Sequence, residues 1–429
     1  MKSASKYIFA ILAFAALAIP AWLHAQDQRT HYSVQNLGSL GGTNCCLVVG
    51  LNNIGWVDGT SNVAGDNSFH PFLWRDGKMQ DLGTLGGPNA SVGGMNDVGD
   101  VTVGGADTTT PDPLGEDWCG FGTHLICRSF VWRNGRRMLV PTLGGNNGDV
   151  STITNTGLVL GFAETATRDD TCIAPEVLGF AAFLWDPDQN EIRALRPLSG
   201  DTVTGAFGLN EHGDAAGTSG ICGRGLVATS ALHAVLWKNG LPIDLGSFGG
   251  SYTNLANSIN NLDQVVGVSD LIGDATTHAF LWTEGQGIQD LGTLLGHFSS
   301  AGNDINDNGQ VVGQSCDVNF NCRAVVWERG AITDLNTLIP ATSPLFLVFA
   351  SAINSQGQIV GEALDQSTGA TVPFLATPCD EAPYDAEGCE NASESAPGVS
   401  AQSIVVLPEK LRKQLRRRLN FGRFGNRMD

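Results

Sequence analysis

Three histidines at one recurring position are the first residues of this chain whose type and spacing suggest chemistry. His70, His233 and His278 each precede a short apolar run that ends in tryptophan. Imidazoles brought together could bind a metal ion or exchange protons near neutral pH. A repeated position, however, places its copies on separate units of the fold. We therefore expect hydrogen-bonding or packing roles for these histidines, and we predict no metal site and no cofactor.

One acidic turn has the beginning of a calcium-binding loop. Residues 304–309 read Asp-Ile-Asn-Asp-Asn-Gly, and calcium loops offer oxygen ligands at such alternating positions. The twelfth position requires a bidentate glutamate, but it is Ser315 here. Asparagine followed by glycine is also typical of tight turns. We interpret the segment as a turn.

Recognisable catalytic motifs are absent from the sequence. It contains no nucleophile elbow, phosphate-binding loop, dinucleotide fingerprint or zincin motif. This favours a protein that is not an enzyme. An enzyme on this scaffold would need two carboxylates, or a histidine with a carboxylate, whose pKa values are shifted at a channel mouth.

The elements that carry these residues form a unit that recurs seven times. In one copy, His-Ala-Phe-Leu-Trp at 278–282 is followed by Asp-Leu-Gly-Thr-Leu at 290–294 and by Ile-Asn-Asp-Asn-Gly-Gln-Val-Val-Gly at 305–313. Each unit is predicted to contain four short strands, and in one copy these are 254–260, 264–269, 278–282 and 288–292. Four antiparallel strands per unit are typical of a propeller blade.

The strand around Trp282 is apolar on both faces, which is expected of a sheet packed between two others. Its tryptophan would then wedge between blades. The alternative is a core aromatic residue in a linear β-solenoid.

The ends of the array favour a ring over a line. The array begins at 32–37 with a single strand that corresponds to the fourth strand of a unit. Its final unit ends at 372–376 with the third strand and has no fourth strand of its own. Pairing the two would complete a seventh sheet and hide edges that invite aggregation. We predict an all-β, seven-bladed propeller of four-stranded antiparallel blades that closes in this way.

Loop lengths distinguish the two faces of the predicted ring. The turns between the first and second strands, and between the third and fourth, are short and define a short-turn face. The opposite, long-loop face carries the variable connections between the second and third strands, which are long at 105–127, 162–179 and 218–232. Binding residues concentrate on loops held by a rigid scaffold. The best candidates for ligand contact are Trp118, Phe121, His124, Arg168, Asp169 and Asp170; the alternative is that these loops only cap the channel.

Ten cysteines fit an oxidising compartment. Topology favours pairing Cys119 with Cys127, Cys316 with Cys322, and Cys172 with Cys222 in adjacent blades. Cys379 and Cys389 lie after the ring and are further disulfide candidates. Cys45 and Cys46 are adjacent, so they could pair with each other or elsewhere.

The two ends of the chain differ from the repeats. Residues 1–25 are predicted to be a secretory signal peptide cleaved near Ala25, rather than a membrane anchor. The propeller is expected over 26–378, an acidic linker over 379–405, and a basic amphipathic tail over 406–429. The tail has two interpretations: contact with an anionic membrane or polymer, or docking onto the acidic propeller.

The net charge of −19 excludes one class of partner. The tail has a net positive charge, so the propeller itself is more acidic than the net charge of the whole chain indicates. Nucleic-acid binding requires a cationic surface, so we expect no nucleic-acid partner. Solubility alone can explain the acidic surface.

The three phrases recurring in register resemble the bacterial extracellular repeat named the HAF family after its His-Ala-Phe signature. The resemblance covers about 32–378. Blades 2 to 4 depart from it: Arg128-Ser129 replaces His-Ala, Val140-Pro141 replaces Asp-Leu, and Leu198-Ser199-Gly200 replaces Leu-Gly-Gly. The resemblance implies a secreted repeat protein without an established activity, and it identifies no catalytic residue.

Three functions follow as hypotheses. The first is a secreted, non-enzymatic protein that binds an extracellular glycan or protein through the long-loop face. The second is a propeller hydrolase or lyase that acts on an extracellular polymer. The third is a structural component of the cell envelope, which the basic tail would contact.

Overall fold

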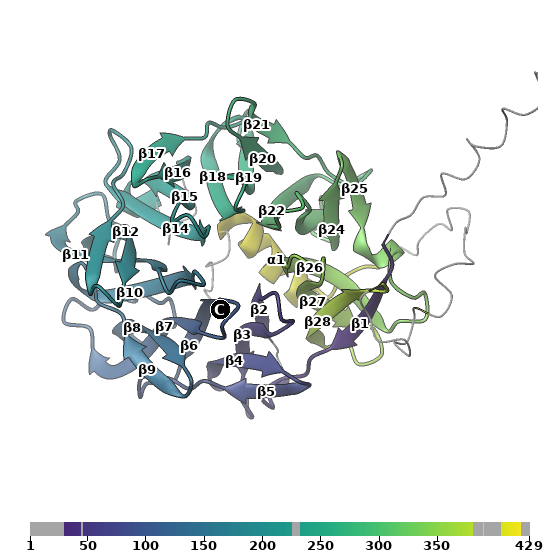
Figure 1. Ribbon diagram of the computed structural model, residues 1–429, viewed down its shortest axis with the longest axis horizontal. Coiled ribbons are helices and arrows are strands. Elements are labelled where there is room, and N and C mark those ends of the chain that lie inside the picture. The colour runs from purple at the N-terminus through teal and green to yellow at the C-terminus, as the bar shows by residue number, and fades with distance from the viewer. Residues whose placement is uncertain (1–29, 44–45, 225–231, 381–388, 390–404, 422–429) are drawn as a thin grey trace, which may run out of the picture.

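A computed structural model describes residues 30–43, 46–224, 232–380, 389 and 405–421 of this chain, with side chains in the last segment described only as far as Leu415. Within these residues, seven four-stranded antiparallel sheets are arranged as blades around a central channel (Figure 1). The predicted all-β seven-bladed propeller is therefore confirmed. The predicted signal peptide lies outside the described residues.

Each blade runs from an innermost strand at the channel to an outermost strand at the rim. Blades 1 to 3 are β2 (Leu47–Leu51), β3 (Val57–Asn62), β4 (Phe69–Arg75) and β5 (Lys78–Asp81); β6 (Ala90–Met95), β7 (Val101–Pro111), β8 (Leu125–Arg133) and β9 (Arg136–Leu139); and β10 (Gly144–Ile153), β11 (Val159–Arg168), β12 (Leu178–Asp186) and β13 (Glu191–Ala194). Blades 4 and 5 are β14 (Val203–Leu209), β15 (Ala215–Gly220), β16 (His233–Lys238) and β17 (Leu241–Asp244); and β18 (Gly249–Ile259), β19 (Val265–Leu271), β20 (Thr277–Thr283) and β21 (Gly287–Asp290). Blade 6 is β22 (Ser299–Ile305), β23 (Val311–Cys316), β24 (Cys322–Glu328) and β25 (Ala331–Asp334), and short 3-10 turns occupy Cys222–Arg224 and Leu335–Thr337.

Blade 7 closes the ring with strands from both ends of the array. It contains β26 (Leu345–Ile353), β27 (Ile359–Asp365), β28 (Thr371–Pro378) and, at its rim, β1 (Tyr32–Asn36). β1 is antiparallel to β28, with Tyr32 opposite Pro378 and Asn36 opposite Phe374. Figure 1 shows the purple first strand beside the green last one. The predicted pairing of 32–37 with 372–376 is thus confirmed.

The strands lie at the predicted positions, but several extend further toward the long-loop face than predicted, as β18 does by beginning at Gly249. The hairpin turns expected at Asp76-Gly77 and Asn134-Gly135 have positive φ at both residues, as tight hairpins require. The long connection of blade 2, however, is not all loop, because β7 and β8 extend into it and pair Asp107 with Cys127 and Pro111 with Leu125. This extension was not predicted because its sequence is polar and rich in threonine and lacks the alternation of apolar and polar residues that indicates a strand.

Tryptophans of the third strands lie between blades. Trp185 packs with Val131 and Val140 of the preceding blade. Trp327 of blade 6 donates an Nε1 hydrogen bond of 2.8 Å to the Leu291 carbonyl, which follows the last strand of blade 5. The predicted wedge between blades is therefore confirmed.

The glycine that ends the Val-Val-Gly phrase is required by a close approach of two strands. A Cβ at Gly267 or Gly313 would overlap the carbonyl oxygen of Leu255 or Ala301 on the innermost strand. That strand has a bulge one residue later, as at Ala256 and Ser258. Bulges bend a strand, and here the bend brings its backbone onto the glycine.

Turns on the short-turn face are joined by hydrogen bonds into a ring, which we call the turn ring. The asparagine of each Ile-Asn-x-x-Gly turn accepts hydrogen bonds from its own turn and donates one to the next blade. Asn260, for example, accepts from the N–H groups of Leu262 and Gln264 and donates to the Asn306 carbonyl at 3.0 Å. The same interblade bond starts from Asn52, Asn96, Asn210, Asn306 and Asn354. The predicted role of these asparagines in turns is therefore confirmed. The structure shows that they also connect each blade to the next.

Blade 3 interrupts this pattern, because Thr154 stands where the other six blades have asparagine. Its hydroxyl accepts the Leu158 N–H within the turn, but threonine has no amide to reach the next blade. A second, outer set of bonds continues past this point: Asp97 N–H donates to Asn155, and Asn155 N–H donates to Glu211. The turn ring therefore stays connected at blade 3 through its outer set.

The helix of the tail docks on the opposite, long-loop face. α1 (Glu409–Phe421) follows Pro408 and crosses the centre of the ring in Figure 1. Leu407, Leu411 and Leu415 are 1–3% exposed, and they belong to the apolar cluster at the long-loop end of the channel. The Leu407 N–H also bonds to the Asn321 side chain in the short connection between β23 and β24 of blade 6. Docking of the tail, one of the two interpretations, is confirmed for these residues.

The described residues contain no helix that is both long enough and apolar enough to span a membrane.

Candidate binding face

The two aromatic candidates from the longest loop pack against the protein itself. Trp118 is 9% exposed and packs against Phe162 and Phe180, with ring centroids 5.9 and 5.4 Å away. Phe121 packs edge-on against Phe69 at 4.9 Å. Both rings therefore fix the loop of blade 2 in place. Ligand contact through them remains a prediction.

The four polar candidates lie on two separate loops. His124 is exposed, with Nδ1 2.9 Å from the Gly115 carbonyl. Arg168 and Asp170 are exposed, whereas Asp169 is half-buried and accepts hydrogen bonds from the Thr171 N–H and hydroxyl. Asp169 is thus a turn-stabilising residue, and the exposed trio remains a prediction for ligand contact.

Three disulfides brace connections on the long-loop face, and a fourth lies after the ring. The bonds are Cys119–Cys127, Cys172–Cys222, Cys316–Cys322 and Cys379–Cys389. The first three pairings agree with the topology-based prediction, and the fourth joins the two cysteines expected after the ring. Cys46 is also disulfide-bonded; Cys45 lies outside the described residues.

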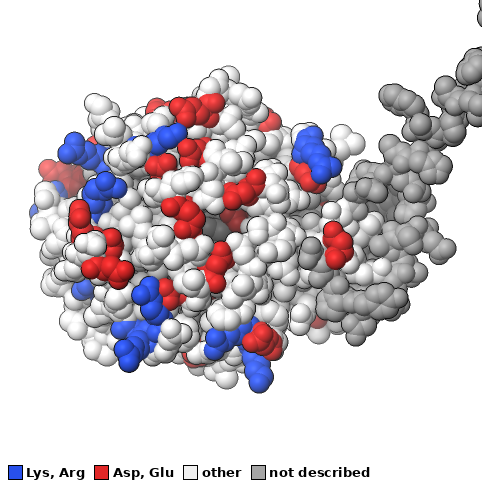
Figure 2. All heavy atoms as spheres, in the orientation of Figure 1, with Lys and Arg blue, Asp and Glu red and all other residues white. Residues whose placement is uncertain are grey.

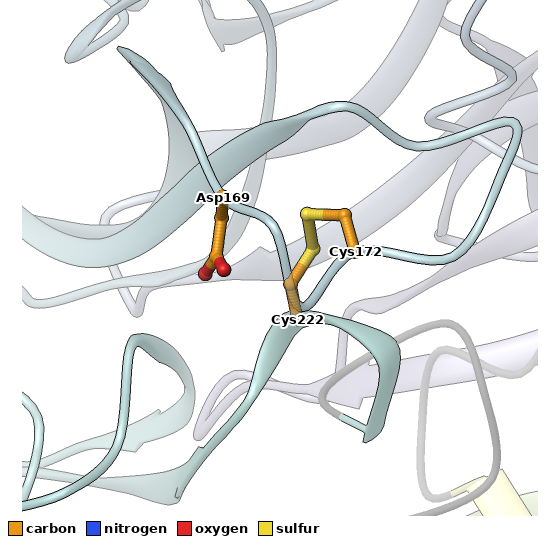
Figure 3. Close-up of side chains that lie close together, drawn as sticks. All are labelled: Asp169, Cys172 and Cys222. Atoms are coloured by element: carbon orange, nitrogen blue, oxygen red, sulfur yellow. A yellow bond between two sulfur atoms is a disulfide. The ribbon is translucent and has the colours of Figure 1, made fainter.

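One of these bonds lies beside a carboxylate. Figure 3 shows Asp169 next to the Cys172–Cys222 disulfide, which ties the loops of blades 3 and 4 together. Metal-binding cysteine is a thiolate, and both sulfurs here are oxidised. The trio is therefore a structural brace.

A second group, which the sequence analysis did not identify, joins the long loops of blades 2 and 3. Glu116, Glu164 and Glu176 each place a carboxylate oxygen within 4.8 Å of the other two. Glu116 and Glu164 are fully buried and Glu176 is 8% exposed. We call these three residues the carboxylate cluster.

Backbone donors and one amide orient two members of the cluster. Oε1 of Glu116 accepts the N–H groups of Val177 and Leu178 at 2.7 and 2.9 Å, so it ties the loop of blade 2 to that of blade 3. Glu164 accepts from the N–H and side-chain amide of Asn147. Asn147 also donates to Asp112, which extends the polar network.

Burial perturbs several acids in this half of the molecule. Burial, aided by the charge of Glu116, raises the pKa of Glu164 to about 7. Burial also raises the pKa of Asp149 to about 7 and that of Asp107 to about 6. Perturbed carboxylates are the feature expected of an enzyme. The carboxylate cluster and Asp107 are buried, whereas Asp149 is half-buried, and neither of the two cavities described below is lined by the cluster.

The repeated histidines pair with repeated aspartates across neighbouring strands. His278 Nδ1 lies 2.9 Å from Asp290 and His70 Nδ1 lies 2.8 Å from Asp81, while His233 and Asp244 are 3.7 Å apart. Although burial acts to raise it, the bond from His278 holds the pKa of Asp290 below its ordinary value. The predicted hydrogen-bonding role is thus confirmed for His70 and His278. The pairs link the third and fourth strands within each blade.

Exposed apolar side chains are unevenly distributed between the faces. Among the described residues, 14 large apolar side chains are exposed. Three lie in turns of the short-turn face (Ile54, Val98 and Leu262) and three on outermost strands (Leu139, Leu241 and Ile243). The other eight lie on the long-loop face: Leu114, Ile173, Tyr252, Ile272, Leu295, Phe298, Val318 and Val406.

Five of those eight belong to adjoining segments of blades 5 and 6 and the tail. The Thr276 hydroxyl bonds to the Phe298 carbonyl, and the Phe298 N–H bonds to the Cys316 carbonyl. Leu407 then bonds to Asn321, as above. These bonds connect the segments that carry Ile272, Leu295, Phe298, Val318 and Val406, which we call the apolar rim.

The short-turn face is polar by contrast. A cavity of about 180 Å³ occupies this end of the channel, lined by Ser151, Thr152, Ser258 and Asp304 among glycines and the apolar ends of the innermost strands. Figure 2 shows acidic side chains around the central opening. Asp304 accepts hydrogen bonds from Ser258 and the Ile353 N–H.

The segment that resembled a calcium loop is therefore a hydrogen-bonded part of the channel wall and turn ring, as its interpretation as a turn requires. A second cavity of about 260 Å³ lies between blades 2 and 3, beside Arg133.

Comparisons with known proteins give only distant structural likenesses. No protein-family model matches the chain, and no curated protein sequence matches it. Similar solved structures include the extracellular domain of BT4673 from B. thetaiotaomicron, with 12% identity over 80% of this chain and 39% of that one and a TM-score of 0.45. Pyrococcus horikoshii acylaminoacyl peptidase has 11% identity over 76% and 50% of the two chains, with a TM-score of 0.43.

TolB from Acinetobacter baumannii has 12% identity over 72% of this chain and 60% of its own, with a TM-score of 0.37. The matches thus cover less than two thirds of each of these structures. At such identities and TM-scores these structures say nothing of what this chain does.

Proposed function

We propose that this chain is a secreted, non-enzymatic binding protein that recognises an extracellular glycan or protein through its long-loop face. The observation that carries the proposal is the concentration of exposed apolar side chains on that face, where the part of the chain that the structure describes has eight of its 14, against three on the short-turn face. Exposed apolar groups that gather on one side of a soluble protein are typical of interaction surfaces. The HAF resemblance is compatible with this proposal.

Rigid loops support the same assignment. The disulfides, the buried Trp118 and the Glu116 bonds to blade 3 hold the loops in one arrangement. A preorganised surface loses less conformational freedom on binding, which improves affinity. The disulfides also support secretion, because such bonds persist in oxidising compartments.

Docking of α1 defines which kind of ligand suits this face. The helix packs at the long-loop end of the channel, so a ligand meets the surface of loops and helix and not an open channel. Such a surface suits a macromolecule. We therefore propose that contact is made by the apolar rim, together with the exposed residues His124, Arg168 and Asp170.

Paired substitutions on the two faces test the proposal. Leu295 is fully exposed and Val318 is 63% exposed, so Leu295→Asp and Val318→Asp should fold normally. Each should lower partner affinity at least about tenfold if the side chain is buried on binding. Val98→Asp and Leu262→Asp, on exposed residues of the short-turn face, are the matched controls. Binding of the mature protein to a glycan array and to cross-linked extracellular proteins would provide the readout.

Each alternative has its own outcome in this design. Equal loss of binding on both faces, or on the short-turn face alone, would contradict the proposal. Turnover of an extracellular polymer in a hydrolysis screen would favour a hydrolase or lyase. Loss of surface retention on truncation of residues 405–429, without any loss of ligand binding, would favour an envelope component.

A further inference from the structure

The carboxylate cluster contains an oxygen that the protein leaves without a partner. Oε1 of Glu116 is satisfied by two backbone N–H groups at 2.7 and 2.9 Å. Its Oε2 is buried and has no hydrogen-bond partner. An ionised carboxylate oxygen buried in this way is destabilising unless a proton, a donor or a cation is supplied. The residue that carries it is fully buried and lies within the cluster.

The spacing of the three carboxylates suits one cation. Oxygens on opposite sides of a Ca²⁺ ion, each about 2.4 Å from it, are about 4.8 Å apart. The three ligand atoms of the cluster all lie within 4.8 Å of one another, so small side-chain adjustments bring all of them within reach of one ion. Mg²⁺ demands near-ideal octahedral geometry at about 2.0–2.1 Å, whereas Ca²⁺ accepts flexible geometry and longer bonds, so the wider spacing of these oxygens favours Ca²⁺. Zn²⁺ prefers nitrogen and sulfur ligands, and this cluster offers oxygen alone.

We propose that Glu116, Glu164 and Glu176 form a calcium site that joins the long loops of blades 2 and 3. The ion binds Oε2 of Glu116 and one oxygen of each of the other two carboxylates. Glu116 sits in the loop of blade 2, Glu164 on β11, and Glu176 in the loop of blade 3. Calcium therefore locks these loops to each other. The site is independent of the proposed partner, and its test uses the mature protein alone.

Glu116→Gln is the informative variant, because it separates calcium binding from folding. The amide oxygen can keep both bonds to Val177 and Leu178, while the new NH₂ group replaces the unpartnered oxygen and can donate to the remaining carboxylates. The calcium-free variant should thus be at least as stable as the calcium-free wild type. Its calcium affinity should fall at least about 100-fold.

Isothermal titration and thermal unfolding after EGTA treatment give the two readouts. The wild type should bind one Ca²⁺ with a Kd of about 10⁻⁴ M or below. A hundredfold excess of Ca²⁺ over Kd should raise Tm by about 2–5 °C, and equal Mg²⁺ should not. Asp107→Asn is the matched control, since it neutralises another buried acid in blade 2 outside the cluster and should leave calcium binding unchanged.

Several outcomes would overturn the site. Absence of saturable calcium binding by the wild type up to millimolar concentration would do so. Wild-type affinity in Glu116→Gln, or an equal loss in Asp107→Asn, would place the ion elsewhere. If Glu116→Gln fails to fold, as judged by its calcium-free Tm, Glu176→Gln replaces it and must lose the calcium response.

Discussion

The two faces of this propeller are built on different plans. On the short-turn face, one asparagine is repeated in six blades, and each copy donates to the carbonyl of its counterpart in the next blade. On the long-loop face, almost nothing repeats: disulfides, a carboxylate cluster, exposed apolar groups and a docked helix occur at individual blades. The difference shows that the repeated residues close the ring. The residues that are not repeated form the surface that distinguishes one face from the other.

The physical basis of this division is the geometry of a ring. A residue that contacts its own counterpart in the next blade must be present in every blade for the contact to close. A residue that contacts an unrelated loop has no such requirement. The predictions below test whether stability and individuality are separated between the faces in this way.

The largest effect is expected from the turn ring. Asn260→Ala removes three hydrogen bonds within the turn and the bond to the Asn306 carbonyl. Because these groups are buried, we expect a loss of about 3 kcal/mol in the free energy of unfolding. Urea denaturation measures it. Asn319→Ala, an exposed residue on the long-loop face, should change stability by less than about 0.5 kcal/mol. Equal effects would remove the distinction between the faces.

Leu411→Asp should release α1 without opening the ring. Leu411 is 3% exposed against the propeller, and burying it contributes about 2–3 kcal/mol. A charge at this position makes docking unfavourable, so the tail should lose protection in hydrogen exchange while the blades keep theirs. Gln414→Asp, on the exposed side of the helix, is the control. Cooperative unfolding of the blades with the tail would show that the helix is part of the scaffold.

A pH effect should come from Asp149. Burial raises the pKa of this carboxyl to about 7 from 3.8, so between these values the folded state retains a proton that the unfolded state has released. Stability therefore falls as pH rises from about 4 to 7. Asp149→Asn should remove about 3 kcal/mol of this decline, as measured by urea denaturation at pH 4.5 and 8. The exposed Asp170→Asn should leave the decline intact.

The smallest effect is a gain. Thr154→Asn should restore the missing interblade bond and raise the free energy of unfolding by about 1 kcal/mol. Thr156→Asn, two residues further along the same turn, is the control and should have no such effect. A loss of stability in Thr154→Asn would mean that the bond of the Thr154 hydroxyl to Leu158 outweighs closure of the inner ring at this blade.

Much of the fold could be predicted from recurring local patterns. The Val-Val-Gly phrase, the Asp-Gly and Asn-Gly turns and the lone strand at 32–37 indicated blades, hairpins and closure. Such signals are readable because they depend on neighbours in sequence or on the next copy of the same phrase. The interblade bonds of the turn asparagines were the part of this pattern that went unrecognised, although the regular recurrence of asparagine was a signal for them.

The candidate site was much less predictable. Trp118 and Phe121 could be named from the sequence as candidates for ligand contact, but their packing against Phe162 and Phe69 could not. Glu116, Glu164 and Glu176 carry no motif, and the first and last are 60 residues apart. Their meeting depends on how β11 and two irregular loops pack, which no local pattern reports.

The amino-acid sequence by itself determined the number of blades, their four-stranded form and the way the ring closes. These follow from side-chain alternation, glycine conformations and a repeated phrase, all of which act over short distances along the chain. Only the tertiary structure decided that the leucine stripe of the tail closes the long-loop end of the channel and that three distant glutamates meet. Contacts between non-repeated segments depend on how whole blades are placed in three dimensions. The local sequence of one such segment does not indicate which other segment it contacts.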